Sequence, residues 1–363
     1  MRVTTLIAEA QARTANAETL SAKFREHMAE HGLEVDGTDA DYRVAFPGGV
    51  ASFRLQAGAI ALRIEAINAE RLAEAQGVVA GHLDGFAAGE SLGIVWTGDG
   101  VTATGALPHN FRVTRVKRVM DVTPHMRRLT LTGEDLGRFD AEAMHVKIFI
   151  PAPGGDGREP VWPHVSASGQ PVLDGCSLTR RTYTIRRIDV AAKEMDIDFV
   201  LHGDASPGSR FAMHARPGDW LGISGPGGGD VPLRGWTLIG GDETALPVIA
   251  RALEAMPQDA RGQVLIEVAV AAEEQPLSPP PGMALRWLHR NGTAPGVLLL
   301  EAIRNLNWPA GEEASAWVAC EGATAVALRE HFAQVVGLPR SHFRAVAYWR
   351  QGLAEGAGKA EAA

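Results

Sequence analysis

Arg181 and Tyr183 are the first residues whose types and spacing could bind a cofactor. They lie two positions apart in the run RRTYTIR, so in a strand their side chains project from one side while Thr184 projects from the other. A guanidinium pairs well with a pyrophosphate, and a tyrosine ring stacks well on a planar group such as a flavin. An edge strand with solvated arginines and a core tyrosine accounts for the same run, and the run alone leaves both interpretations open.

The run HGDASPGSRFA is a second candidate site, and it contains His202, Gly203 and Ser209. Glycine and serine let a backbone approach a ligand closely, and successive N–H groups can cradle phosphate oxygens. A helix that begins near Ser209 would add the positive end of its dipole. A turn capped by a serine, with no ligand, is the simpler explanation of the run taken alone.

Three strand ends supply the third group of candidates. Asp242, Glu243 and Thr244 stand in GGDETALP, where a short apolar strand gives way to a helix. Glu321 follows another strand in ACEG, and Arg350 follows the last one in YWRQG. The carboxyl ends of parallel strands and the free N–H groups of helix starts favour anions and dinucleotides. The GxGxxG fingerprint is absent, so a purely structural helix start also fits GGDETALP.

The elements that must position these residues fall into three segments. Residues 1–100 combine alternating strands with amphipathic helices at Ala17–Glu30 and Arg71–Phe86, which predicts a small α+β domain. Residues 108–232 contain short strands separated by Gly and Pro, which predicts an antiparallel β-barrel. Strands alternate with helices over residues 233–353, which predicts a doubly wound parallel sheet. Residues 354–363 are small and polar and are expected to form a flexible tail.

The composition is that of a globular protein. The chain has 363 residues, a net charge of −8 and no long basic run, so nucleic acid is not an expected partner. An uncharged apolar run of about 18 residues is absent, so no membrane insertion is expected. The two cysteines, far apart in the sequence, fit the cytoplasm. No HExxH or paired CxxC pattern occurs, so no metal site is predicted.

The order of the motifs RTYT, HG…PGS, GDETALP, ACEG and YWRQG resembles that of the siderophore-interacting protein family, which is ferredoxin-reductase-like. The resemblance covers about residues 108–353, and residues 1–97 resemble a DUF2218-type domain. It implies a multidomain fold with an FAD-binding barrel and an NAD(P)H-binding α/β domain. The implied activity is reduction of ferric siderophores by NAD(P)H through FAD, with release of Fe(II) in the cytoplasm.

The resemblance also assigns the candidate residues, and the flavin rather than a side chain carries the chemistry. The FAD ring and pyrophosphate would be held by Arg181, Tyr183, Thr184, His202, Gly203 and Ser209. The NAD(P)H side would be formed by Asp242, Glu243, Thr244 and Glu321. Ferric siderophore would contact Lys147, Arg350 and, as a third basic residue, Arg234. The sequence departs from the family pattern at Ser206, Gly208, Phe211, Cys320 and Ala347.

Two other functions remain open from the sequence. One is a general NAD(P)H:flavin or ferredoxin-linked oxidoreductase, in which ferredoxin would be a partner. The other is a siderophore-binding protein that kept the fold and lost electron transfer. The sequence does not discriminate among siderophores or among NADH, NADPH and ferredoxin as electron donors. It also leaves open the oligomeric state and the role of the N-terminal domain.

Overall fold

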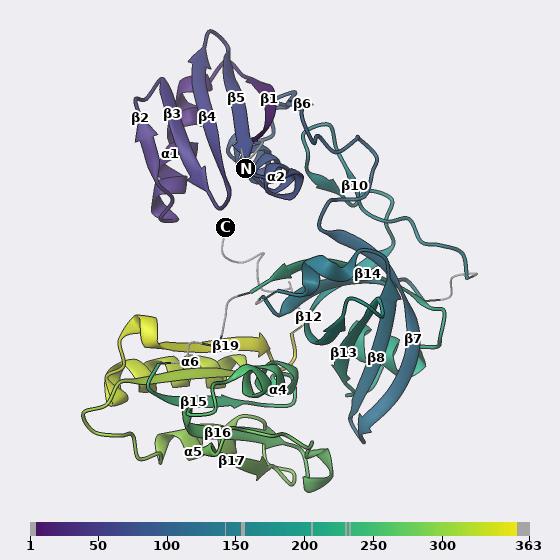
Figure 1. Cartoon of the computed structure of the whole chain (residues 1–363), viewed down its shortest axis with the longest axis vertical. Coiled ribbons are helices and arrows are strands. Elements are labelled where there is room, and N and C mark those ends of the chain that lie inside the picture. Colours follow the sequence, from purple (N-terminus) through teal and green to yellow (C-terminus); the bar gives the residue numbers. More distant parts are fainter. Residues whose placement is uncertain are drawn as a thin grey trace. The chain divides into compact units, whose positions relative to one another are not determined.

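The computed structural model describes residues 5–141, 143–153, 157–204, 206–228, 231 and 234–353, which form two compact units (Figure 1). The first unit combines Met1–Phe111 with Pro160–Ser177, and the second combines Arg112–Glu159 with Leu178–Ala363. The predicted tail, residues 354–363, lies outside the described residues.

The first unit contains an antiparallel sheet of six strands in the order β2-β3-β4-β5-β1-β6. The strands are β1 (Leu6–Arg13), β2 (Val35–Gly37), β3 (Asp41–Phe46), β4 (Gly49–Gln56), β5 (Ala59–Ala66) and β6 (Thr97–Gly98). Helices α1 (Ala17–Glu30) and α2 (Ala69–Phe86) pack on the sheet and on each other. Helix α1 has the predicted bounds. Helix α2 begins two residues earlier than predicted, because the Asn68 side chain accepts the N–H of Arg71 at 2.9 Å and caps the first turn.

Residues 160–177, here called the inserted loop, belong to the first unit although barrel strands flank them in the sequence. The loop forms a short hairpin of β10 (His164–Val165) and β11 (Pro171–Val172). Its turn packs along α2, where Gly77 and Gly81 present backbone instead of side chains. A cavity of about 390 Å³ remains along this contact.

Replacing Gly77 by Ala is expected to stabilise the protein. A Cβ at Gly77 would lie 3.7 Å from the nearest neighbour, the carbonyl oxygen of Gly169, which is ordinary contact beside the cavity. Alanine has a higher helix propensity than glycine in a helix interior, so the change should raise the free energy of unfolding by up to ~1 kcal/mol. Thermal unfolding should show a higher midpoint. Gly81→Ala is the comparison, because its Cβ would meet Gln170 Oε1 at 3.2 Å and should gain less. A lower midpoint for Gly77→Ala would contradict this description of the contact.

The second unit begins with a closed barrel of strands in the order β12-β13-β8-β7-β14-β9 (Figure 1). The strands are β7 (Phe111–Thr123), β8 (Met126–Gly133), β9 (His145–Pro151), β12 (Leu178–Asp189), β13 (Glu194–Val200) and β14 (Trp220–Gly227). Inward side chains such as Leu129, Ile148 and Ile197 are fully buried and form its core. Helix α3 (Pro207–His214) follows β13. The predicted barrel is therefore confirmed.

A parallel sheet completes the second unit, in the strand order β17-β16-β15-β18-β19. Its strands are β15 (Trp236–Gly241), β16 (Arg261–Val268), β17 (Gly282–His289), β18 (Ala314–Glu321) and β19 (Phe343–Trp349), with helices α4 (Leu246–Ala255), α5 (Val297–Arg304) and α6 (Gly322–Glu330). Short helical turns lie at Leu136–Phe139, Ala271–Glu273, His331–Val336 and Arg340–His342. The first strand, β15, lies centrally between β16 and β18, so a topological switch point falls at its carboxyl end. The predicted doubly wound sheet is confirmed.

Polar contacts join the barrel to the sheet. Glu273, which is 2% exposed, accepts hydrogen bonds from the Thr123 hydroxyl and the His125 N–H. The Arg251 guanidinium on α4 donates to the carbonyl of Ile185 at 2.9 Å. The Arg251 bond joins α4 to β12, the strand that carries the RTYT motif.

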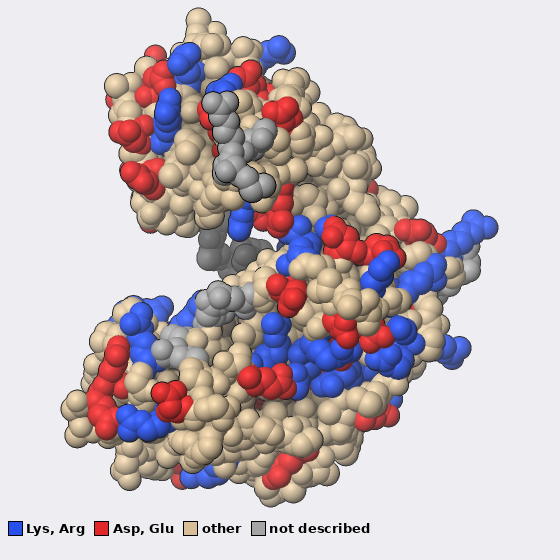
Figure 2. Space-filling view, viewed as in Figure 1, with Lys and Arg blue, Asp and Glu red and all other residues tan. Residues whose placement is uncertain are grey.

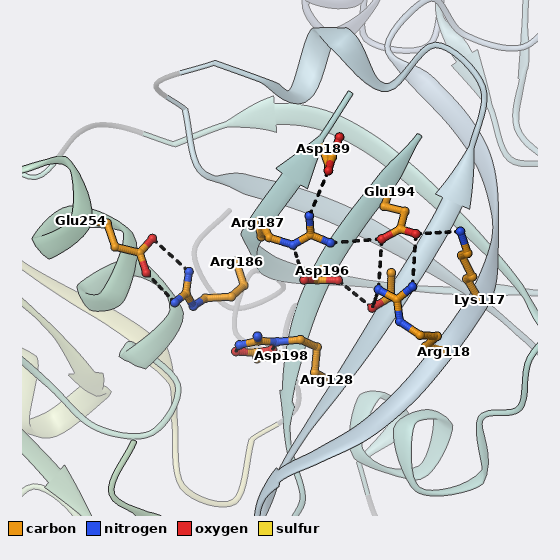
Figure 3. A network of polar contacts seen from close by, with 11 residues as sticks. Lys117, Arg118, Arg128, Arg186, Arg187, Asp189, Glu194, Asp196, Asp198 and Glu254 are labelled. Atoms are coloured by element: carbon orange, nitrogen blue, oxygen red, sulfur yellow. Dashed lines mark hydrogen bonds and ion pairs between the residues drawn. The ribbon is translucent and has the colours of Figure 1, made fainter. Parts of the chain in front are cut away.

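Lys and Arg side chains alternate with acidic ones over the outside of the barrel (Figure 2). Figure 3 shows that they neutralise one another: Arg187 lies between Glu194 and Asp196, and Arg118 and Lys117 bind the same Glu194. The hydrogen bonds from Arg118 and then Lys117 lower the pKa of Glu194 to about 2.

Acid should therefore weaken the barrel through Glu194. The pKa of Glu194 is lower in the folded protein than its ordinary value of 4.5. Its ion pairs therefore add to the free energy of unfolding above pH 4.5, and this stabilisation is lost as the pH falls toward 2. Thermal unfolding of the Glu194→Gln variant should depend less on pH in this window than that of the unmodified protein. Glu134→Gln is the matched control, because Glu134 is 81% exposed in its pair with Lys193. Equal pH dependence of the Glu194→Gln variant and the unmodified protein would contradict the expectation.

Candidate functional site

Tyr183 and Arg181 lie on β12, where the predicted alternation places both on one side of the strand. The Tyr183 ring packs on Phe199 with ring centroids 4.3 Å apart. Its hydroxyl lies against Gly208, where a Cβ would come within 2.1 Å of the hydroxyl oxygen. Glycine at position 208 therefore lets the RTYT motif approach the start of α3. Arg181 is half-buried, and its guanidinium donates to the carbonyl of Arg180 at 2.7 Å.

The turn that precedes α3 contains a glycine in the left-handed region. Gly203 has a φ of +88°, a conformation that favours glycine. The His202 N–H donates to the Ser209 hydroxyl at 3.0 Å, and Ser209 is fully buried. The Ser209 side chain therefore stabilises the turn. The predicted contact of Ser209 with FAD would be made by its backbone N–H. Thr184, 5% exposed, pairs with His145 across β12 and β9.

Asp242 is buried at the carboxyl end of β15, with 2% of its surface exposed. Its carboxylate accepts hydrogen bonds from the N–H and hydroxyl of Thr244 and from the Trp349 indole N–H at 2.8 Å. Burial raises the pKa of Asp242 to about 6, and the hydrogen bonds from Thr244 and Trp349 oppose that rise. The side chains of Asp242 and Thr244 are thus engaged in fixing the end of the sheet.

Glu243 pairs with Arg290, which also reaches the fully buried Glu267 at 3.3 Å. Glu267 accepts the N–H groups of Gly296 and Leu299 at the start of α5, at 2.7 and 2.8 Å. Sequence reasoning missed Glu267 and Arg290. The available signal was an acidic residue inside the otherwise apolar run VLIEV, because a buried carboxylate requires partners.

Glu321 caps helix α6. Its carboxylate accepts the N–H groups of Ala323 at 2.6 Å and Thr324 at 3.2 Å, and its other oxygen accepts the N–H of Gln351 at 3.4 Å. A carboxylate at this position is stabilised by the helix dipole. The structure shows that Glu321 caps α6. The contact of Glu321 with NAD(P)H remains a prediction.

The segment from Tyr348 to Gln351, here called the YWRQ segment, connects the other motifs. The Tyr348 hydroxyl and His145 Nε2 on β9 are 2.7 Å apart, which joins the sheet to the barrel. Trp349 binds Asp242 of GDET, and Gln351 binds Glu321 of ACEG. Sequence reasoning assigned no role to His145 or Tyr348, because the contacts join positions 203 residues apart.

Positive charge gathers around this segment. Lys147 is exposed on β9 and donates to the Thr182 hydroxyl. Arg350 is exposed, and its stem lies against Gly322, where a Cβ would be 2.8 Å from Arg350 Cγ. Burial lowers the pKa of His145, and the charges of Arg251, Arg344 and Lys147 lower it further. His145 is therefore neutral at pH 7, within a cationic environment that suits an anionic ligand.

Arg234 is not brought to this site. It precedes β15 and so lies at the amino end of the sheet, whereas Asp242 and Glu321 lie at the carboxyl end. Its side chain is 53% exposed and pairs with Glu313 at 3.8 Å. The structure therefore leaves the predicted third basic contact without support.

The structure also bears on metals and membranes. Within the described ranges, no three His, Cys, Asp or Glu side chains are grouped to hold a metal ion. None of the helices in that part of the chain is long and apolar enough to cross a membrane. Cys320 is fully buried beside the site, and burial raises the pKa of its thiol.

A closed barrel followed by a doubly wound sheet carries the candidate residues, and the family models give the class of protein. Three family models match: an uncharacterised bacterial family (DUF2218) over residues 9–97, a siderophore-interacting FAD-binding domain over 115–230 and a siderophore-interacting protein over 234–352. The chain belongs to the siderophore-interacting protein family.

Individual relatives agree with this assignment. Ferric vibriobactin reductase ViuB of Vibrio cholerae is 35% identical over 247 residues, 64% of this chain and 87% of that protein. An NADPH-dependent ferric-chelate reductase of Escherichia coli is 30% identical, over 66% of this chain and 92% of its own length. The crystal structure of the siderophore-interacting protein SipS from Aeromonas hydrophila is 36% identical, with a TM-score of 0.59 over 68% of this chain and 94% of that one. A siderophore utilization protein from T. fusca is 38% identical, with a TM-score of 0.60 over 69% and 97%.

The residues present fit FAD. Tyr183 offers a half-exposed ring, and glycines at 203 and 208 remove the Cβ atoms that would obstruct close approach of a ligand or of Tyr183. FAD is the flavin cofactor of this chain.

Proposed function

We propose that this protein is an NAD(P)H-dependent, FAD-containing reductase that removes iron from ferric siderophores as Fe(II) in the cytoplasm. The observation that carries the proposal is the YWRQ segment. Its residues Tyr348, Trp349 and Gln351 connect barrel strand β9 to the GDET and ACEG motifs, which supports Arg350 of this segment and Lys147 of β9 as parts of one site.

When bound, FAD accepts two electrons from NAD(P)H and passes them singly to iron, so one nicotinamide reduces two ferric ions. The protein supplies binding and orientation. Tyr183 would stack on the flavin ring, Thr184 would lie near its reactive nitrogen, and Arg181 would pair with the pyrophosphate. His202, Gly203 and Ser209 would lie along the FAD tail, with backbone N–H groups supplied by Gly203 and Ser209. Asp242, Glu243, Thr244 and Glu321 would form and hold the nicotinamide side of the cleft.

Lys147 and Arg350 would bind the anionic ferric siderophore beside the flavin. Both are exposed, and the cations near His145 add to the local positive field. Fe(II) binds hard oxygen ligands more weakly than Fe(III), so reduction releases the metal. The neutral His145 and Tyr348 pair would keep the strand that carries Lys147 next to the last strand of the sheet.

Acceptor selectivity tests the proposal against a general oxidoreductase. With NADH or NADPH as the donor, ferric siderophore should be reduced with a saturable dependence on its concentration. An uncharged artificial acceptor such as a quinone should be reduced by the Lys147→Ala, Arg350→Ala double variant as well as by the unmodified protein. Equal effects of the double substitution on both acceptors would contradict a dedicated siderophore site.

Ferredoxin stays a proposed alternative donor. An acidic ferredoxin would need an unneutralised basic surface. The basic side chains shown in Figure 3 are paired with acids, so ferredoxin would compete with siderophore for the exposed Lys147 and Arg350. We therefore propose the nicotinamide as the donor. Turnover that requires reduced ferredoxin and ignores NADH and NADPH would reverse the preference.

A further inference from the structure

The cavity beside α2 is lined throughout by residues of the first compact unit. Its volume, about 390 Å³, is typical of sites that hold small organic molecules. Helix α2 forms one wall, and Trp96, residues 101–110 and the inserted loop form the others. More than half of the side chains in these walls are apolar, among them Val101, Pro108 and Val165. A molecule that fills the cavity therefore needs an apolar body.

Trp96 gives the cavity an aromatic surface. This residue is 4% exposed, and its indole N–H donates to the carbonyl of Ser168 at 2.9 Å. Because that N–H is already engaged, the indole offers a ligand its apolar ring rather than a hydrogen-bond donor. Aromatic rings pack favourably against one another in offset or edge-to-face arrangements, so an aromatic body suits this wall.

Gln76 on α2 supplies a polar group that calls for a partner. This residue lines the cavity and is only 2% exposed. Its Nε2 is buried and has no hydrogen-bond partner among the residues that the structure describes. A buried N–H group without an acceptor destabilises a folded protein, so such groups normally have one. An oxygen atom of a molecule in the cavity would supply the acceptor that Gln76 lacks.

The charges of the walls disfavour an anion. Glu74 lines the cavity; its Oε2 accepts a hydrogen bond from Arg71 at 2.8 Å, and its Oε1 lies 3.9 Å from Nε2 of His109. The described residues that line the cavity include two histidines, His82 and His109, but no Lys or Arg. An anionic ligand would therefore meet the Glu74 carboxylate without a permanent positive charge in the walls to offset it.

We propose that this cavity binds a small, uncharged aromatic molecule that carries a carbonyl oxygen, such as an aryl amide. The carbonyl oxygen accepts a hydrogen bond from Gln76 Nε2, and the ring packs against the apolar walls that include Trp96. This ligand differs in charge from the anionic siderophore and from phosphate-bearing cofactors. The site gives the N-terminal domain a binding role of its own, which does not rest on the proposed reductase function.

Gln76→Leu in the full chain is the direct test, and Gln56→Leu is its matched control. Leucine is similar in size to glutamine but has no amide, so the substitution removes the buried N–H and keeps the wall apolar. The thermal unfolding midpoint should stay equal or rise, because a buried group without a partner is lost. Gln56, at the end of β4, is exposed and lies outside the cavity lining.

The measurements are dissociation constants for benzamide, benzoate and toluene, obtained by ligand-observed NMR titration. A pH of 8 is used because imidazoles are ordinarily neutral there. We expect the unmodified protein and Gln56→Leu to bind benzamide equally well, and about tenfold or more tightly than benzoate. Gln76→Leu should raise the constant for benzamide about tenfold, the effect of one hydrogen bond. It should leave the constant for toluene, which has no oxygen, unchanged.

Benzamide bound equally well by Gln76→Leu and by the unmodified protein would overturn the proposal, as would benzoate bound as tightly as benzamide. The comparison with benzoate uses the unmodified protein and so needs no variant to fold. Failure of the unmodified protein to bind benzamide would mean that the cavity holds water only, and the proposal would be wrong. Equal losses of benzamide and toluene binding in Gln76→Leu would contradict the hydrogen bond to Gln76.

Discussion

Replacing Lys147 and Arg350 together by alanine is expected to weaken ferric-siderophore binding by about 100-fold or more. Both side chains are exposed, and hydrogen bonds to charged groups contribute about 1.5–3 kcal/mol each, roughly 10–100-fold per residue. FAD content should not change, because neither side chain belongs to the proposed FAD contacts. Binding is measured by titrating the oxidised protein with ferric siderophore, and FAD content by the flavin absorbance of the purified variant.

Arg234→Ala is the matched control for this experiment. It also removes one exposed positive charge, but at the amino end of the sheet and in a pair with Glu313. Its affinity for ferric siderophore should equal that of the unmodified protein. A loss in Arg234→Ala as large as that in the double variant would show that binding responds to net charge rather than to a site around the YWRQ segment.

The second large effect is a pH dependence governed by Asp242. Its pKa of about 6 lies above the ordinary value of 3.8. At about 1.36 kcal/mol per pH unit, ionisation of the buried carboxyl costs ~3 kcal/mol. Because the pKa of Asp242 is raised in the folded protein, its protonated form adds to the free energy of unfolding. This stabilisation is complete below about pH 3.8 and is lost as the pH rises through 6.

Activity should change in the opposite direction. Only the ionised carboxylate accepts all three hydrogen bonds from Thr244 and Trp349, so protonation below about pH 6 should loosen the YWRQ segment. The rate of ferric-siderophore reduction is therefore expected to fall as pH drops through 6. Trp349→Phe removes the hydrogen bond that ties this segment to Asp242, so its rate should be lower at every pH and should not fall near pH 6.

Asp242→Asn supplies the control for this profile. Asparagine does not titrate, so the fall near pH 6 should disappear while a lower rate remains at every pH. Stopped-flow measurement of siderophore reduction by pre-reduced protein from pH 5 to 8 gives both profiles. A fall near pH 6 that persists in Trp349→Phe or in Asp242→Asn would contradict the role of Asp242.

The sequence predicted the barrel, the parallel sheet and helix α1 because those elements have local signals. Alternation and turn residues marked the barrel strands, and helical periodicity marked Ala17–Glu30. Matching the order of the motifs to a known family then predicted the cofactors. Neither the local patterns nor the order of the motifs shows which motifs contact one another in the folded protein.

The contacts within the site were the part that sequence reasoning missed. Asp242 and Trp349 are 107 residues apart, and His145 and Tyr348 are 203 apart, so no local pattern links them. Glu321 and Ser209 were assigned to ligands, yet their side chains cap a helix and hold a turn. The inserted loop was missed because, apart from a short hairpin, it has no periodicity and its partners precede it by up to about 90 residues.

The visible spectrum of the purified protein tests the central claim most directly. With FAD bound, we expect flavin bands near 380 and 450 nm, roughly as for any bound flavin. Under anaerobic conditions these bands should bleach on addition of NADH or NADPH and recover when ferric siderophore is added. A protein that stays colourless in the presence of FAD, or a reduced flavin that ferric siderophore does not reoxidise, would contradict the account.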